Sequence, residues 1–318
     1  MAGRLKARFL ALSRAGATVF AVLTGLLVAS GPARALEAVR VAENVYALVG
    51  PLEQRSASNL GNNATFGVII TADGVVLIDS GGSAKGAVAI EAAVRRLTDK
   101  PIRTVINSGG QDHRWFGNDY FRSRGARIIA ASAAVADQES RAAQQLQGMT
   151  ALIGATAMDG TQLAFAERRF EERLELQAGG IKIEIRHPGQ AHTPGDSFIW
   201  LPEQGIAFAG DIVFMDRLLG IGPQSSSRAW LSAFEAIEAL HPVVIVPGHG
   251  WPGPLQKAKR ETYDYIHDLR NGIGRLLESG ADLASAADLD QSGYRHLAVF
   301  DELSRRNAQA VYQEMELE

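Results

Sequence analysis

The candidate metal ligands of this chain occur in four short segments, each at or near the end of a predicted strand. Loops at the ends of separate strands can gather at one edge of a sheet structure, so ligands far apart in the sequence can meet there. Zinc binds histidine nitrogen and carboxylate oxygen, and a catalytic zinc keeps one coordination position for water. The fold must therefore bring together residues 107–113 (NSGGQDH), 192–196 (HTPGD), 210–211 (GD) and 247–250 (PGHG).

The predicted secondary structure follows the same order twice. Strands come first, strand–helix units follow, and the second half of the chain repeats this succession. Such a duplication predicts an α/β fold, an αββα sandwich of two packed mixed sheets with helices on both outer faces. Apolar patterning places strands at 39–49, 66–70, 75–78, 102–106, 127–130, 170–176, 181–186, 198–201, 206–209 and 243–246, and helices at 133–146 and 227–240.

The chain is expected to divide into three parts. The first 35 residues resemble an export signal: basic residues precede an uncharged apolar stretch at 15–29, and Ala33-Arg34-Ala35 provides a small-x-small pattern. We expect cleavage after Ala35 and a periplasmic or secreted protein without stable membrane insertion. An uncleaved anchor is the alternative, but it needs roughly 20 apolar residues. Residues 36–253 should form the sandwich, and the mainly helical residues 254–318 an extension packed on it.

The amino-acid composition limits the classes of binding partner and the side chains that can bind a metal. The leader holds five of the 32 basic residues and none of the 35 acidic ones, so the remaining chain has 27 basic against 35 acidic residues, a formal charge of −8. This acidity argues against nucleic acid as a partner. The chain has no cysteine, which excludes disulfides and thiolate ligands. Any metal must be held by histidine, carboxylate or water.

Three of the seven histidines fall in the segments named above: His113, His192 and His249. A single histidine is more often a hydrogen-bonded structural residue than a metal ligand, because imidazole has many other uses. Grouped with Asp112 and Asp211 in matching loops, these histidines favour a metal centre.

The sequence resembles the metallo-β-lactamase superfamily. The likeness rests on several blocks in order: 76–81 (VLIDSG), Asp112-His113 followed by Gly117-Asn118, and the segments 192–196, 208–211 (FAGD) and 247–250. A narrower likeness, to exported quinoprotein-relay metallohydrolases, rests on the leader, the GGQDH variant and the helical tail. That likeness implies association with a periplasmic oxidation pathway.

The resemblance implies a role for each matching residue. In dinuclear members one metal takes both histidines of a His-x-His motif, whose positions here are Ser108 and Gly110, together with the position of His192. The second metal takes the positions of Asp112, His113, Asp211 and His249, all of which are intact. We therefore expect one metal ion per chain. Zinc is the expected metal, and manganese and iron are the alternatives.

The remaining site expectations concern catalysis. Asp112 is expected as a ligand or a general base, and His192, freed from metal binding, as the residue that orients substrate or moves a proton. Ser108, Gly110 and Gln111 should line the widened cavity. Asp79 either orients the ligands or caps its turn.

Two functions from different classes remain open. The first is an exported metal-dependent hydrolase of a small ester, lactone, thioester or amide. The second is a non-catalytic module that binds a small ligand or a periplasmic oxidase partner. A homodimer through the helical tail is a further expectation.

Overall fold

The computed structural model describes residues 36–318, so the predicted leader and its cleavage site lie outside the described residues. Among the residues described, no helix combines the length and the apolar character needed to span a bilayer.

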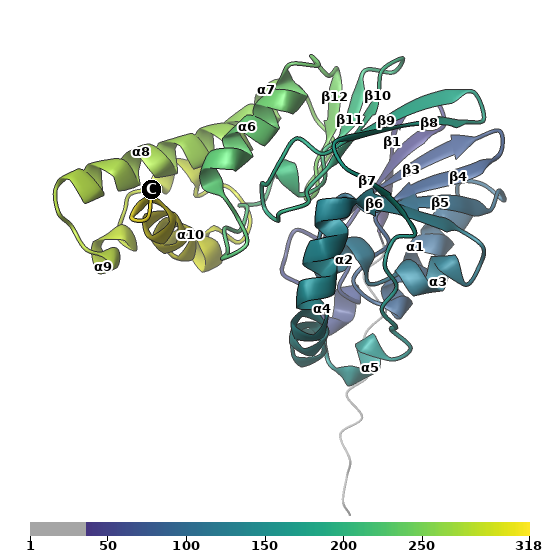
Figure 1. Ribbon diagram of the computed structural model, residues 1–318, viewed down its shortest axis with the longest axis horizontal. Coiled ribbons are helices and arrows are strands. Elements are labelled where there is room, and N and C mark those ends of the chain that lie inside the picture. The colour runs from purple at the N-terminus through teal and green to yellow at the C-terminus, as the bar shows by residue number, and fades with distance from the viewer. Residues whose placement is uncertain (1–35) are drawn as a thin grey trace, which may run out of the picture. The chain divides into compact units, whose positions relative to one another are not determined.

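Two mixed sheets form the centre of the fold (Figure 1). In the first sheet the strands follow chain order; β1 to β4 are antiparallel, and β4 to β7 pair in parallel. The second sheet has the order β12-β11-β10-β9-β8 and is antiparallel except for the β11–β12 pair. The strands are β1 Glu37–Ala42, β2 Val45–Val49, β3 Thr65–Thr71, β4 Gly74–Ile78, β5 Ile102–Ile106, β6 Arg127–Ala131, β7 Arg168–Phe170, β8 Arg173–Ala178, β9 Ile181–Arg186, β10 Phe198–Leu201, β11 Ile206–Phe208 and β12 Val244–Val246.

The helices follow the strands on the outer sides of the sheets. α1 and α3 accompany the first sheet, and the helices after β11 accompany the second (Figure 1). The α-helices are α1 Ala84–Arg95, α2 Asp112–Trp115, α3 Asn118–Arg122, α4 Ser132–Ile153, α5 Ala155–Met158, α6 Ser227–Glu238, α7 Leu255–Ala258, α8 Asp264–Glu278, α9 Leu283–Ala286 and α10 Phe300–Met315. Short helical turns lie at Ala57–Asn59, Gly210–Ile212, Lys259–Tyr263 and Ser292–Tyr294.

The inner faces of the two sheets share one apolar core. Phe66 and Ile78 of the first sheet belong to the same buried cluster as Ile199 and Phe208 of the second. A Cβ on Gly67 of β3 would lie 2.6 Å from Cε1 of Phe208, so the sheets approach too closely there for any larger side chain. The predicted αββα sandwich is therefore confirmed.

A second apolar cluster covers the other face of the second sheet. Phe198 of β10 is buried together with Trp230 of α6, Tyr265 of α8 and Val311 of α10. α6 begins at a capped end, since the Ser226 side chain accepts a hydrogen bond from the amide of Ala229. The helices after residue 254 thus share a buried core with the sheet.

Two element boundaries differ from the predictions. The helix predicted over 133–146 runs from Ser132 to Ile153, because its polar face packs on protein instead of ending in solvent. The segment 112–115, expected as loop, is the single helical turn α2. Both differences lie beside the candidate site, where tertiary contacts override local pattern.

Replacing Gly67 with alanine should lower the free energy of unfolding by about 1–3 kcal/mol, because the added methyl must displace the Phe208 ring or the Ile78 side chain. Gly148→Ala in α4 is the matched control: its Cβ enters open space, and a gain of about 0.5–1 kcal/mol is expected from helix propensity. Urea unfolding of the three proteins measures both values. Equal stabilities for the two variants would contradict the close sheet packing.

Candidate metal centre

The predicted ligand segments meet at one edge of the sandwich. α2 follows β5, the turn at 210–212 follows β11, and His249 follows β12. Thr65, the first residue of β3, donates its amide to the Gly248 carbonyl at 2.8 Å and its hydroxyl to the Gly250 carbonyl at 2.7 Å. The loop that carries His249 is therefore fixed on both sides by the opposite sheet.

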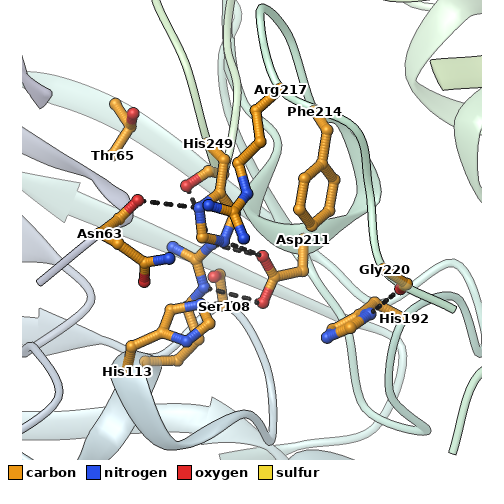
Figure 2. Close-up of polar contacts among 12 residues, drawn as sticks. Asn63, Thr65, Ser108, His113, His192, Asp211, Phe214, Arg217, Gly220 and His249 are labelled. Carbon is orange, nitrogen blue, oxygen red and sulfur yellow. Dashed lines mark hydrogen bonds and ion pairs between the residues drawn. The ribbon is translucent and has the colours of Figure 1, made fainter. Parts of the chain in front are cut away.

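Three buried side chains converge in this region: His113, Asp211 and His249. One ligand atom of each lies within 4.8 Å of those of the other two. Nε2 of His113 is 3.4 Å from Oδ2 of Asp211, and Nε2 of His249 is 3.3 Å from Oδ1 of the same carboxylate (Figure 2). Asp211 therefore lies between two imidazoles.

The protonation of His249 is set by its partners. Nδ1 lies 2.9 Å from the Asn63 carbonyl oxygen, which can only accept, so Nδ1 carries the hydrogen (Figure 2). Burial holds the pKa of His249 well below its usual value, although Asp211 acts in the opposite direction. The imidazole is neutral, and Nε2 presents a lone pair toward the carboxylate.

His113 also has one ring nitrogen beside a neighbouring polar group and the other directed toward Asp211. Nδ1 lies 3.3 Å from Oδ1 of Asp112, and the buried Nε2 has no hydrogen-bond partner among the described residues. A buried imidazole nitrogen without a hydrogen-bond partner is unfavourable unless a metal ion or another polar group meets it. Two imidazole nitrogens and a carboxylate oxygen are a donor set that zinc accepts. The residues present thus fit a divalent metal.

Arg114 binds both oxygens of the Asp211 carboxylate. Its buried guanidinium donates Nε to Oδ2 at 3.0 Å and Nη2 to Oδ1 at 2.5 Å, and Nη1 to Oδ2 of Asp79 at 2.9 Å. Burial alone would raise the pKa of Asp211, but Arg114 and His113 hold it well below the usual value. The carboxylate is therefore ionised and fixed in orientation.

Asp79 connects this pair to Ser108. Its left-handed backbone (φ 66°) follows β4, and its carboxylate accepts the Ser108 amide at 2.7 Å and the Ser108 hydroxyl at 2.8 Å. Burial raises the pKa of Asp79, with Arg114 and Ser108 acting against that change. Asp79 thus orients Arg114, which in turn orients Asp211. Ser108 is used in this network and does not line the cavity.

Asp112 lies behind the His113 ring. Its Oδ1 accepts the His113 amide at 2.7 Å and forms an ion pair with Arg55. Burial would raise the pKa of Asp112, but Arg55 and His113 lower it, so the group is ionised. The structure does not bring Asp112 into the group formed by His113, Asp211 and His249. Its place as a metal ligand stays a prediction.

Helix α4 fills the space beside the two glycines of the altered motif. The Gly109 carbonyl accepts Nε2 of Gln138 at 3.0 Å, and the Gly110 carbonyl accepts Nε2 of Gln145 at 2.9 Å. A Cβ on Gly110 would overlap the carboxylate of Asp137, which is buried and paired with Arg141. A side chain at position 110 would have to displace the Asp137 carboxylate from its pair with Arg141, and Gly110 itself does not line the cavity.

His192 lies apart from the three-residue group. Nδ1 is 3.0 Å from the Gly220 carbonyl oxygen and therefore carries the hydrogen (Figure 2). The ring is packed near Trp230, 5.6 Å between centroids, and burial lowers its pKa. Its Nε2 is left with an acceptor lone pair.

A cavity of about 500 Å³ adjoins these residues. His113, His192 and His249 line the cavity. Of Ser108, Gly110 and Gln111, which were predicted to line it, Gln111 does so. Phe214 also lines the cavity and stacks on His249 with ring centroids 4.7 Å apart. The size suits a small organic molecule.

Sequence reasoning missed the residues that support the ligands, Arg114 and Arg55 above all. Arg114 follows His113 directly, yet an arginine in a short helical turn is usually solvent-exposed, and its burial depends on two carboxylates from other strands. Gly109 and Gly110 could have indicated the contact with α4, because adjacent glycines mark the close approach of another element.

The comparisons with known proteins agree with this geometry. The family model described as the metallo-beta-lactamase superfamily matches residues 61–249. Curated relatives include the alpha subunit of 2,4-dinitroanisole O-demethylase from Nocardioides sp., 24% identical over 70% of this chain and 63% of that protein. A linear primary-alkylsulfatase from Pseudomonas sp. is 21% identical over 62% of this chain and 44% of that protein. The chain thus covers less than two thirds of either relative.

Solved structures show the same fold at low identity. A metallo-beta-lactamase from Pontibacter korlensis matches with a TM-score of 0.58 and 17% identity, over 70% of this chain and 95% of that one. The inverting sec-alkylsulfatase Pisa1 from Pseudomonas sp. matches with a TM-score of 0.68 and 19% identity, over 87% of this chain and 50% of that one.

Restoring the two histidines, Ser108→His with Gly110→His, should not restore a second metal position. The Gly110 substitution collides with Asp137 and should lower the free energy of unfolding by about 1–3 kcal/mol or more. Gly148→His, on an open part of α4, is the control and should leave stability and metal content unchanged within about 1 kcal/mol. Two metal equivalents in a stable double variant would contradict the closed space.

The metal-free protein should show a histidine-dependent loss of stability in mild acid. Because the folded-state pKa of His249 lies below the unfolded value of about 6.5, the unfolded chain binds more protons below that pH, and stability falls by up to about 1.4 kcal/mol per pH unit. His249→Asn should remove this contribution.

The measurement is the free energy of unfolding in chelator at pH 7.5 and pH 5.5. Asp196, whose pKa burial and Asp211 raise to about 8, acts with the opposite sign over this window, so the test is the difference between variants. Replacing the exposed His267 with asparagine is the control. An identical pH dependence in wild type and His249→Asn would refute the assignment.

Proposed function

Because the chain belongs to the metallo-beta-lactamase superfamily, we propose that it is a hydrolase that uses one divalent metal, zinc, held by His113, Asp211 and His249. The observation that carries this proposal is the convergence of Nε2 of His113 and Nε2 of His249 on the ionised Asp211 carboxylate at a cavity. The metal, when bound, supplies a water of pKa ~7 and polarises the bond to be cleaved.

Each protein residue has a separate task in this proposal. Arg114 and Asp79 hold the Asp211 carboxylate in one orientation, and the Asn63 carbonyl fixes the His249 tautomer. Asp112 orients the His113 ring through Nδ1 and remains paired with Arg55. For Asp112 to act as the predicted ligand or base, its carboxylate would have to leave Arg55.

We assign the proton transfer to His192. Its Nδ1–H is used by Gly220, so Nε2 can accept a proton at the cavity and return it to the leaving group. Its lowered pKa keeps the ring neutral at the start of the reaction, which is the form a general base needs.

The substrate class is a small ester, lactone, thioester or amide. The relatives carry the names of an O-demethylase, an alkylsulfatase and β-lactamases, including one from Elizabethkingia meningoseptica at 23% identity. These names cover several kinds of bond, so the superfamily does not fix the reaction. The proposal has four further parts. They are export after cleavage at Ala35, a boundary between sandwich and helical extension at residue 253, association with a periplasmic oxidation pathway, and a homodimer.

A non-catalytic binding module is the second candidate. The observation in its favour is the space beside Gly110, where α4 replaces a metal ligand with the Asp137–Arg141 pair. A module of this kind would keep the cavity and lose turnover.

The purified chain should contain one zinc equivalent and hydrolyse at least one member of a set of chromogenic esters, lactones and a cephalosporin, with activity removed by chelator and restored by zinc. His249→Ala should lose most of the metal, measured by plasma mass spectrometry. His192→Gln should retain the metal while kcat falls about 10²–10⁴-fold and KM changes little.

His267→Gln, an exposed imidazole substitution, is the control and should keep wild-type kcat and metal content. Bound metal without chelator-sensitive turnover would favour the binding module. A His249→Ala variant with full metal content would refute the metal centre itself.

A further inference from the structure

One wall of the cavity is built by α10, which lies outside the matched residues 61–249. Glu302, Leu303, Arg306 and Asn307 line the cavity. Counted from Glu302, the other three residues lie one, four and five positions further along the chain. This spacing places all four on one face of the helix. The cavity therefore has a boundary that the family match does not include.

α10 is fixed relative to His192 by hydrogen bonds to the loop at residues 219–221. Asn307, which is buried, donates Nδ2 to the Leu219 carbonyl at 2.8 Å and accepts the Ile221 amide at 2.9 Å. Between these two residues lies Gly220, whose carbonyl holds His192. Side chains on α10 thus have a defined position beside the proposed proton-transfer residue.

The charged residues that line the cavity are three arginines and one acid, Glu302. Arg55 is paired with Asp112. Arg217 is 5% exposed and donates to the carbonyls of Leu52 and Glu53 and to the Gln54 side chain.

Arg306 differs from the other two arginines. It is exposed, and its guanidinium makes no hydrogen bond or ion pair within residues 36–318. Burial and the neighbouring Arg55 lower the pKa of Arg217 to about 10, with Glu302 acting in the opposite direction, so Arg217 still carries its charge at neutral pH. With Arg55 paired to Asp112, Glu302 offsets one of the two remaining arginine charges of the cavity. Like charges that share a cavity repel, and a bound anion would relieve that repulsion.

Apolar side chains complete the cavity. Phe214, Ile221 and Leu303 line it together with Leu152, a leucine that is 52% exposed. A ligand that fits these surfaces has an apolar body and one anionic end.

We propose that the substrate carries a singly charged oxyanion, a carboxylate or an alkyl sulfate, on an apolar body, and that Arg306 of α10 binds this group while Arg217 contributes charge from the cavity wall. Arginine suits the role because its planar donors match two oxygens of such a group. The inference deepens the proposed function and rests on it for the reaction, but the binding step can be measured without turnover.

The test uses three probes that present the same phenyl group: 4-phenylbutanoate, 3-phenylpropyl sulfate and the neutral 4-phenylbutan-1-ol. Isothermal titration calorimetry gives the Kd of each for the zinc-loaded chain and for the chain in chelator. Both anions should bind more tightly than the alcohol in both states. The two anions separate a carboxylate preference from a sulfate preference.

Arg306→Gln should raise the Kd of the preferred anion about fivefold to tenfold and leave that of the alcohol unchanged. Arg306→Lys should lose less, since it keeps the charge. Arg305→Gln is the matched control: Arg305 is the adjacent exposed arginine of α10, pairs with Asp288 and does not line this cavity. It should bind all three probes like wild type.

Equal affinity for anions and alcohol would overturn the inference. So would an equal loss in Arg305→Gln and Arg306→Gln, which would indicate general surface charge. An anion preference that disappears in chelator and is unaffected by Arg306→Gln would assign the anion to the metal alone, and would leave the proposed hydrolase intact. Conversely, anion binding through Arg306 without any hydrolysis would uphold the subsite and refute the hydrolase.

Discussion

The Asp211 carboxylate is the group on which the candidate site depends. It receives two hydrogen bonds from Arg114, and each of its oxygens also lies 3.3–3.4 Å from an imidazole nitrogen. A buried carboxylate without such partners would be protonated, and one without Arg114 could rotate. Because Arg114 is itself held by Asp79, the orientation of a ligand on the second sheet is decided by a residue at the end of a strand in the first. The two sheets therefore have to pack in one relative position for the site to exist.

Helix α4 closes the space beside Gly109 and Gly110. Gly109 and Gly110 are not simply positions without side chains, because α4 places Gln138 and Gln145 against their carbonyls and Asp137 against the Cα of Gly110. The space is filled and both glycine carbonyls are paired, which lowers the cost of burying these groups, while Oε1 of Gln138 has no hydrogen-bond partner among the described residues. The same helix is longer than its apolar pattern predicts, and its extra turns bring Leu152 to the cavity.

The C-terminal helices connect stability with recognition. α10 shares a buried core with the second sheet, and the same helix lines the cavity. Asn307 links the two, since its side chain is bonded to the backbone of the loop that also carries Gly220 and thereby positions His192. A change in the tail can therefore reach His192, the proposed proton-transfer residue, through these hydrogen bonds.

Local sequence determined the strands, most helices, the sandwich and the meeting of His113, Asp211 and His249, because alternating apolar patterns and strand-end loops constrain these features directly. The tertiary structure decided the rest. It placed Asp112 beside Arg55, Ser108 beside Asp79, and Asp137 beside Gly110. Each of these pairings joins residues 27 or more positions apart through ion pairs, hydrogen bonds or close packing. Such contacts have no periodicity in the chain, so only the packing of the two sheets and α4 determines which partner each residue meets.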